Sequence, residues 1–156
     1  MILKQILAGG DRNFSYIIAD EISHAAAAID PGFPPASETD FLKQNGLLLR
    51  YIINTHGHTD HTAGNEMLAK LTGARIAMHA STRSKHDIDL NDGDHMELGS
   101  LELTIIHTPG HTHDSLCILA DGNLITGDTL FVGKIGGTGF GRDAWDEYQS
   151  IRRKLV

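Results

Sequence analysis

Short apolar runs separated by turn-forming residues dominate this chain, and they predict strands more often than helices. The run Leu47–Ile53 is almost continuously apolar, as expected for a strand that is buried on both faces. Shorter or alternating runs predict further strands at Ile2–Leu7, Phe14–Ala19, Ala25–Ile29, Arg75–Met78, Leu101–His107, Ser115–Ala120 and Asn123–Thr126. Asp121-Gly122, between the last two runs, is a dipeptide typical of tight hairpin turns.

Three other segments have features of helices. Thr62–Leu71 places apolar residues three or four positions apart, and Gly73 follows as a residue that commonly ends a helix. A helix is also predicted over Ala36–Gln44, after a proline-rich turn. Another is predicted over Asp143–Val156, with Ala144, Tyr148, Ile151 and Leu155 on one face. Strands mixed with a few helices predict a layered α/β or α+β domain.

Composition narrows the class of protein. A length of 156 residues fits a single domain, residues 1–156, and a formal net charge of −7 argues against binding nucleic acid, which needs clustered Lys and Arg. No apolar run approaches the roughly 20 residues that a membrane-spanning helix needs. The single cysteine, Cys117, excludes an internal disulfide framework and a cysteine-only metal site, and it makes a reducing cytoplasm the default compartment.

Three of the ten histidines cluster directly after the buried apolar run. The segment Thr55–His61 reads Thr-His-Gly-His-Thr-Asp-His. At the end of a strand, residues i and i+2 point to the same side, so His56 and His58 can reach one metal ion. Asp60 and His61 come where the next helix begins and can reach a neighbouring ion. Neutral imidazole and carboxylate groups suit Zn²⁺, Fe²⁺ or Mn²⁺.

Two other predicted strands also end in a candidate ligand. Leu101–His107 is followed by Thr-Pro-Gly and then His111, and Asn123–Thr126 is followed by Gly and then Asp128. Three separate buried strands thus each deliver a potential ligand just past the carboxyl end, where ligand sites of layered α/β folds gather. We therefore predict a metal centre built from His56, His58, Asp60, His61, His111 and Asp128.

Three ordered motifs carry a resemblance to a known family. Thr55–His61, Thr108–Thr112 (Thr-Pro-Gly-His-Thr) and Thr126–Phe131 (Thr-Gly-Asp-Thr-Leu-Phe) resemble motifs of the metallo-β-lactamase superfamily. The chain is most similar to the glyoxalase II (hydroxyacylglutathione hydrolase) and persulfide dioxygenase branch, from the turn Ile29–Gly32 through to the last predicted helix. The resemblance implies an αββα sandwich with metals at one edge of the sheets.

The resemblance also implies a role for each predicted ligand. The first metal would be bound by His56, His58 and His111, the second by Asp60 and His61, and both would be bridged by Asp128. The family's second metal also uses a later histidine in a Pro-Gly-His turn, and this sequence ends before such a motif. We therefore expect a truncated form of a longer protein, one domain without the usual C-terminal segment.

The implied activity is cleavage of a thioester, such as a glutathione or other thiol conjugate, by a hydroxide formed on one or two Zn²⁺ ions. Asp60 would both hold a metal and orient the water. The alternative is a mononuclear-iron persulfide dioxygenase, in which His56, His111 and Asp128 bind Fe²⁺; mixed Fe/Zn/Mn occupancy also suits these ligands. A third possibility is a non-catalytic metal-binding module. The oligomeric state is left open.

The segment after Asp128 bears on the substrate. Glyoxalase II and persulfide dioxygenases have a basic residue and aromatic groups in this segment, which in glyoxalase II bind glutathione. This chain keeps Thr138 and Phe140 but has Gly137 at the basic position. Lys134 or Arg142 could supply the missing cation, although each is more typical of an ordinary surface charge. The surrounding glycines predict a flexible loop over the substrate entrance.

Overall fold

The strands of the computed structural model, which describes residues 1–8, 13–139 and 143–156, form two sheets. The first sheet has the order β1-β2-β3-β4-β5-β6. Its β1, β2 and β3 pair antiparallel, whereas β3, β4, β5 and β6 run parallel. These strands are β1 (Ile2–Leu7), β2 (Phe14–Ala19), β3 (Ala25–Ile29), β4 (Leu48–Ile53), β5 (Arg75–His79) and β6 (Ile88–Leu90).

The second sheet is antiparallel and has the order β10-β9-β8-β7. Its strands are β7 (His95–Leu98), β8 (Leu101–His107), β9 (Leu116–Ala120) and β10 (Asn123–Ile125). Asp121 and Gly122 join β9 to β10 with φ angles of 46° and 75°. Two residues in the left-handed region are what a type I′ hairpin turn requires, so the predicted hairpin is confirmed.

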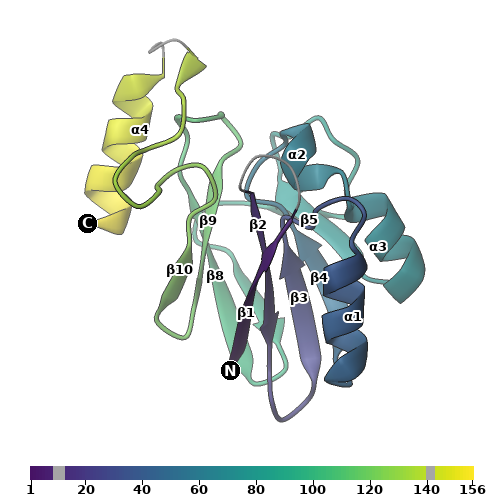
Figure 1. Ribbon diagram of the computed structural model, residues 1–156. Coiled ribbons are helices and arrows are strands. Elements are labelled where there is room, and N and C mark those ends of the chain that lie inside the picture. Colours follow the sequence, from purple (N-terminus) through teal and green to yellow (C-terminus); the bar gives the residue numbers. More distant parts are fainter. Residues whose placement is uncertain (9–12, 140–142) are drawn as a thin grey trace.

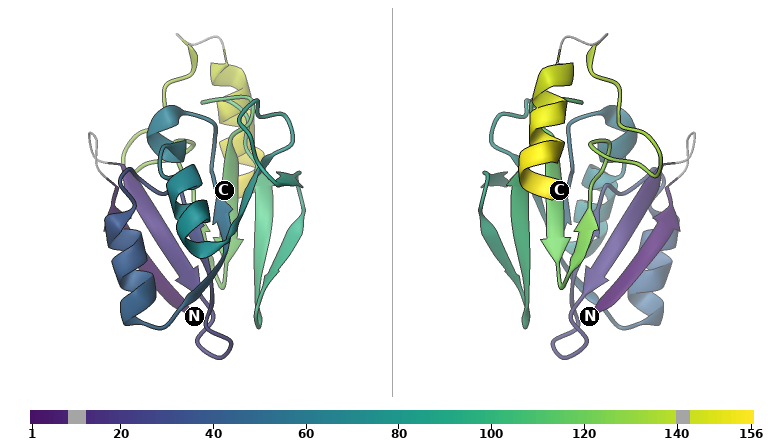
Figure 2. Two further views of the ribbon diagram at one scale, coloured as in Figure 1. Left: turned by 90° about the vertical axis from the view of Figure 1, so that its right-hand side faces the viewer. Right: turned by 90° about the vertical axis from the view of Figure 1, so that its left-hand side faces the viewer.

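Helices complete the layers. In Figure 1 the order across the molecule is α4 (Ala144–Ser150), the second sheet, the first sheet, and then α1 (Ala36–Gln44) with α3 (Asn65–Thr72). The two views of Figure 2 face these opposite helical layers in turn. The single turn α2 (Thr59–Thr62) precedes α3, and the π-helical turn η2 (Ile151–Leu155) continues α4. The predicted αββα sandwich is confirmed. No helix in the described ranges is long and apolar enough to cross a bilayer.

Two apolar cores explain why β4 is apolar almost throughout. Ile53 faces the core between the sheets, together with Ile29, Leu103, Ile105 and Leu116. Ile52 faces the opposite core, where the first sheet packs against Leu42 of α1 and Leu68 of α3. Both isoleucines are fully buried. A strand with a core on each side has no face that favours polar residues, which confirms the interpretation of this run.

The predicted helix Thr62–Leu71 is wrong in one respect, because it is divided into α2 and α3 at Ala63 and Gly64. The division lies where the chain passes close to the turn after β3. Gly64 N–H donates to the carbonyl of Pro31 at 3.2 Å, and a Cβ on Gly64 would come within 2.2 Å of the Gly32 carbonyl oxygen. Gly73 ends α3 in the left-handed conformation, as predicted.

The structure also contains strands that the pattern did not predict, β6 and β7. Each lies at the edge of its sheet. Both are short, and β7 alternates polar and apolar residues over only four positions. The predicted ends of the other strands agree with the structure to within one residue.

The C-terminal helix packs with a different face from the one predicted. Tyr148, on the predicted apolar face, is exposed and stacks on the exposed Trp145 with ring centroids 5.5 Å apart. The buried side chains of α4 are instead Glu147 and Ser150. Ile151 and Leu155, also on the predicted face, are half-buried. The fully packed positions of α4 are therefore polar, because they meet a turn whose backbone offers donors and acceptors.

Candidate metal centre

The carboxyl ends of β4, β8 and β10 bring the predicted ligands to one edge of the sandwich. Among the described residues, two groups of side chains can hold an ion, His56 with His58 and His111, and His56 with His61 and Asp128. Within each group the ligand atoms lie within 4.8 Å of one another. The three strand ends thus place His56, His111 and Asp128 close together. One detail differs, since β10 is mostly exposed rather than buried.

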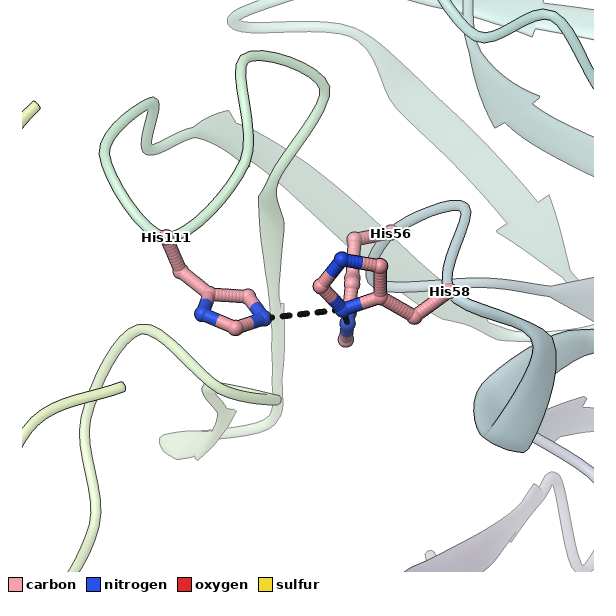
Figure 3. A group of neighbouring side chains, drawn as sticks. All are labelled: His56, His58 and His111. Atoms are coloured by element: carbon pink, nitrogen blue, oxygen red, sulfur yellow. Dashed lines mark hydrogen bonds between the residues drawn. The ribbon is translucent and has the colours of Figure 1, made fainter. Parts of the chain in front are cut away.

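The first group is a cluster of three imidazole rings (Figure 3). His58 Nδ1 lies 2.9 Å from His56 Nε2 and 3.1 Å from His111 Nε2. The rings of His58 and His111 approach edge to face, with centroids 4.8 Å apart. His56 is almost fully buried, whereas His58 is exposed. The cluster is therefore anchored in the protein on one side and open to small molecules on the other.

Hydrogen bonds outside the cluster fix which ring nitrogens face its centre. His56 Nδ1 lies 3.1 Å from Thr55 Oγ1, whose own proton goes to Asp30. His111 Nδ1 lies 2.8 Å from the Gly137 carbonyl oxygen, which can only accept. Both rings therefore carry their proton on Nδ1 and turn the lone pair of Nε2 inward. Two lone pairs converge on His58 Nδ1, which can donate to only one of them, and this arrangement fits a cation.

The second group contains a buried ring nitrogen that makes no hydrogen bond with the described residues. Nε2 of His61 has no hydrogen-bond partner among the described residues. It points at two carboxylates, 3.4 Å from Asp128 Oδ1 and 3.7 Å from Asp60 Oδ2. On the other side of the ring, Nδ1 lies 3.0 Å from Asp30 Oδ2. An aspartate that holds Nδ1 leaves Nε2 as the metal-binding atom, so the residues present fit a metal here too.

The pKa values of two histidines, His56 and His61, indicate where positive charge is stabilised at the candidate metal centre. Burial would lower the pKa of His61, but contacts with the carboxylates of Asp128 and Asp30 outweigh it and raise the pKa to about 10. The pKa of His56 falls to about 4, through burial and the neighbouring His61. The environment therefore favours a cation beside His61 and Asp128 while it keeps His56 neutral, the form in which imidazole binds metals.

Asp60 lies at the margin of this arrangement. Its carboxylate is largely exposed and accepts a hydrogen bond from Asn13 Nδ2 at 2.7 Å. It belongs to neither group of candidate ligands. The turn α2 explains the contrast with its neighbour, because it directs His61 into the protein and Asp60 outward. Its assignment as ligand and catalytic residue remains a prediction.

Asp30 and Thr55 are the residues of this site that the sequence pattern did not single out. Asp30 accepts hydrogen bonds from the Thr55 backbone N–H at 2.7 Å and from its hydroxyl, and it also holds His61. A signal was available, since Asp30 directly follows strand β3 just as the candidate ligands follow β4, β8 and β10. It also adopts a positive φ of 48°, which is uncommon outside glycine.

A cavity of about 360 Å³ opens beside the second group. Its walls include His61 and Asp128 together with the aromatic rings of Phe14, Tyr16 and Phe131. A neighbouring cavity is lined by Lys134 and by Gly136 and Gly137 of the glycine-rich segment. Nζ of Lys134 lies 5.2 Å from the centre of the Phe131 ring. Phe140 and Arg142, which the sequence also suggested for substrate binding, lie outside the described residues.

The glycine-rich segment also supports the site directly. A Cβ on Gly136 would come within 2.2 Å of the Asp128 carbonyl oxygen and 2.8 Å of His111 Nδ1. The next residue supplies the carbonyl that holds the His111 ring. Glycine is therefore required here for close approach to two candidate ligands, a role that the prediction of a flexible loop did not include.

Comparison with known proteins identifies the family to which this chain belongs. The family model of the metallo-beta-lactamase superfamily matches residues 8–87 and 81–156. The chain is 37% identical over 136 residues to the hydroxyacylglutathione hydrolase of Anaeromyxobacter dehalogenans, an alignment that covers 86% of this chain and 52% of that protein. It is 31% identical over 160 residues to the mitochondrial persulfide dioxygenase ETHE1 of Homo sapiens, covering 99% of this chain and 63% of that protein.

A solved structure shares the whole described fold. ETHE1 from Myxococcus xanthus matches with a TM-score of 0.93 at 30% identity, over 99% of this chain and 70% of that one. The chain spans only 52% and 63% of the lengths of the two curated relatives. The family match extends over nearly all of its residues, and the resemblance inferred from the three motifs is confirmed: the chain belongs to the metallo-beta-lactamase superfamily.

Proposed function

We propose that this protein is a metal-dependent hydrolase that cleaves thioesters of a small thiol such as glutathione. The observation that carries the proposal is the position of His58, within 3.1 Å of both His56 and His111. Three histidines form a ligand set found in zinc hydrolases, and a neighbouring second position beside His61 and Asp128 suits a second ion. We propose Zn²⁺ as the metal, one domain over residues 1–156 as the unit that binds it, and the cytoplasm as its compartment.

In the proposed reaction, different residues of the protein would hold the metal, orient the water and fix the histidine rings. A bound metal would lower the pKa of water toward neutrality and polarise the carbonyl of the thioester. Asp60 lies at the open side of the site, where its exposed carboxylate can accept a hydrogen bond from water and orient it. Thr55, Asp30 and the Gly137 carbonyl hold the histidine rings in the required tautomers.

The substrate class is supported by the surroundings of the site and by the relatives. The cavity beside His61 is lined by aromatic rings and can accept an apolar acyl group. Lys134, in the adjoining cavity, is the described cation best placed to meet a carboxylate of the thiol carrier. A hydroxyacylglutathione hydrolase is among the similar proteins. Together these features favour a glutathione thioester as the first substrate to test.

The decisive test combines metal analysis with turnover. Protein purified without added metal is assayed for bound zinc and iron and for release of thiol from hydroxyacylglutathione, with and without O₂. We expect zinc and O₂-independent cleavage. His58→Ala should lower kcat by more than the roughly 10–100-fold that follows loss of a group outside the ligand set. His95→Ala, an exposed histidine of β7, is the matched control and should be unchanged. Bound metal without turnover would support the non-catalytic module instead.

A persulfide dioxygenase is the second candidate. It is favoured by the similarity to two proteins named ETHE1 over nearly the whole chain, and by His111 Nε2 lying 3.5 Å from Asp128 Oδ2. Two histidines and one carboxylate suit mononuclear Fe²⁺ in oxygenases. One bound iron with O₂ uptake on glutathione persulfide, and only a mild effect of His58→Ala, would replace the hydrolase proposal with this one.

A further inference from the structure

The C-terminal helical segment carries a polar face that the proposed chemistry does not use. Glu147, Ser150 and Lys154 are spaced three and four residues apart, so they line one side of α4 and η2. Glu147 is fully buried and Ser150 is 4% exposed. In Figure 1 this segment stands beside the second sheet. Its two buried polar side chains contact the turn that carries His111.

Each of the three side chains contacts a different backbone group of that turn. Glu147 Oε2 accepts the backbone N–H of His111 at 2.7 Å. Ser150 Oγ donates to the Pro109 carbonyl at 2.7 Å. Lys154 Nζ donates to the His107 carbonyl at 2.7 Å and also pairs with Asp92. The helix thus holds the segment from the end of β8 to the candidate ligand at three points.

The contact between Glu147 and the turn is unusually close. A Cβ on Gly110 would lie 2.0 Å from Glu147 Oε2 and 2.4 Å from its Cα, so only glycine allows this approach. The other oxygen, Glu147 Oε1, is buried without a hydrogen-bond partner among the described residues. Burying a carboxylate that is half unsatisfied is costly, and an apolar side chain could attach the helix at lower cost. The carboxylate is therefore better explained by the one donor that it meets, the N–H of His111.

We propose that Glu147 is a positioning residue for the three-histidine metal site, and that it acts by fixing the backbone of His111. The inference rests on the proposed role of His111 as a ligand. Glu147 holds the backbone of His111, and the Gly137 carbonyl holds its ring at Nδ1. The two contacts together leave Nε2 directed at His58. Loss of the first contact would let the turn move and would weaken metal binding at this position.

Metal titration of two Glu147 variants tests the proposal. Glu147→Gln keeps an oxygen that can accept the His111 N–H, whereas Glu147→Leu keeps similar bulk without an acceptor. The variants are made in a His61→Ala background, so that Co²⁺ reports on the three-histidine position alone through its visible spectrum. We expect Glu147→Leu to weaken Co²⁺ binding about 10–100-fold and to shift the spectrum, and Glu147→Gln to remain within about 3-fold of its parent.

Two controls keep the result interpretable. Asp146→Leu changes an exposed neighbour on the same helix and should leave Co²⁺ affinity unchanged. The melting temperature of each metal-free variant reports on folding, and Ser150→Ala replaces Glu147→Leu if the latter does not fold, with a weaker loss of affinity expected. Unchanged Co²⁺ affinity in Glu147→Leu, or equal losses in the Leu and Gln variants, would overturn the proposal. The readout is metal binding, so it does not depend on whether thioesters are cleaved.

Discussion

Two aspartates at opposite ends of the first sheet have the same burial and different roles. Asp20 directly follows β2 and Asp30 directly follows β3, and each is 3% exposed. Because β2 and β3 run antiparallel, the two carboxylates lie at opposite ends of the sandwich. Each accepts several hydrogen bonds. What distinguishes them is the chemistry of the groups that donate.

Asp20 joins elements of the scaffold. Its carboxylate accepts hydrogen bonds from the backbone N–H and hydroxyl of Ser23 and from the backbone N–H and hydroxyl of Ser100. Ser100 lies between β7 and β8 of the second sheet, so Asp20 ties the two sheets together at this end. None of these partners titrates near neutral pH or binds metal readily. The hydrogen bonds of Asp20 to Ser23 and Ser100 therefore connect parts of the scaffold.

Asp30 has partners of a different kind. It holds Thr55, which orients His56, and it contacts His61 directly. The carboxylate of Asp30 thus helps to orient two candidate ligands, His56 through Thr55 and His61 directly. Burial and position after a strand therefore do not by themselves mark a functional aspartate. The residues that the fold places opposite it decide its role.

Among the changes that compare the two aspartates, Asp30→Asn should have the largest effect on metal binding. The amide presents a donor where Thr55 Oγ1 or His61 Nδ1 needs an acceptor, so one ring loses its fixed tautomer. We expect metal affinity to fall about 10–100-fold, as for other groups that orient metal-binding histidines. Isothermal titration of metal-free protein with Zn²⁺ measures it. Affinity equal to that of the unaltered protein would mean that the two aspartates do not differ in the way proposed.

A smaller effect is expected from Thr55→Val. The variant keeps the side-chain shape and removes the hydroxyl between Asp30 and His56 Nδ1. Zn²⁺ affinity should fall about 10-fold, while Thr55→Ser, which keeps the hydroxyl, should bind Zn²⁺ nearly as well as the unaltered protein. The same titration applies. Similar losses in both variants would assign the effect to packing around Thr55 rather than to its hydrogen bonds.

Asp20→Asn should leave Zn²⁺ affinity unchanged and should act on stability alone. Hydrogen bonds from Ser23 and Ser100 hold the pKa of Asp20 well below its ordinary value. Its ionised form therefore stabilises the fold above about pH 4, the pKa of an aspartate in an unfolded chain, and this contribution is lost as pH falls further. The melting temperature of the variant should be lower than that of the unaltered protein at pH 7, with a gap that narrows below pH 4. A gap that widens on acidification would contradict this account.

The pattern of the chain predicted those elements whose burial is periodic or continuous. It placed β8 at its observed limits and β4 to within one residue, because a strand in a core must be apolar on each buried face. It missed β6 and β7, which are edge strands whose existence depends on pairing with a distant neighbour. It also assigned Tyr148 to the packed face of the last helix, whereas Glu147 is the buried residue there. Glu147 is buried because the helix packs against the backbone of the turn that carries His111, which offers polar groups.

The sequence by itself determined the chemical groups of the candidate metal centre and their placement just after strands. Both are local properties, since His56 and His58 are separated by one residue and follow a strand that must be buried. Only the tertiary structure decided how those groups are held. Asp30 and Thr55 are 25 positions apart, and His111 and Glu147 are 36 apart. Hydrogen bonds between such residues leave no periodic trace in the chain, because each requires two elements to meet at one point in space.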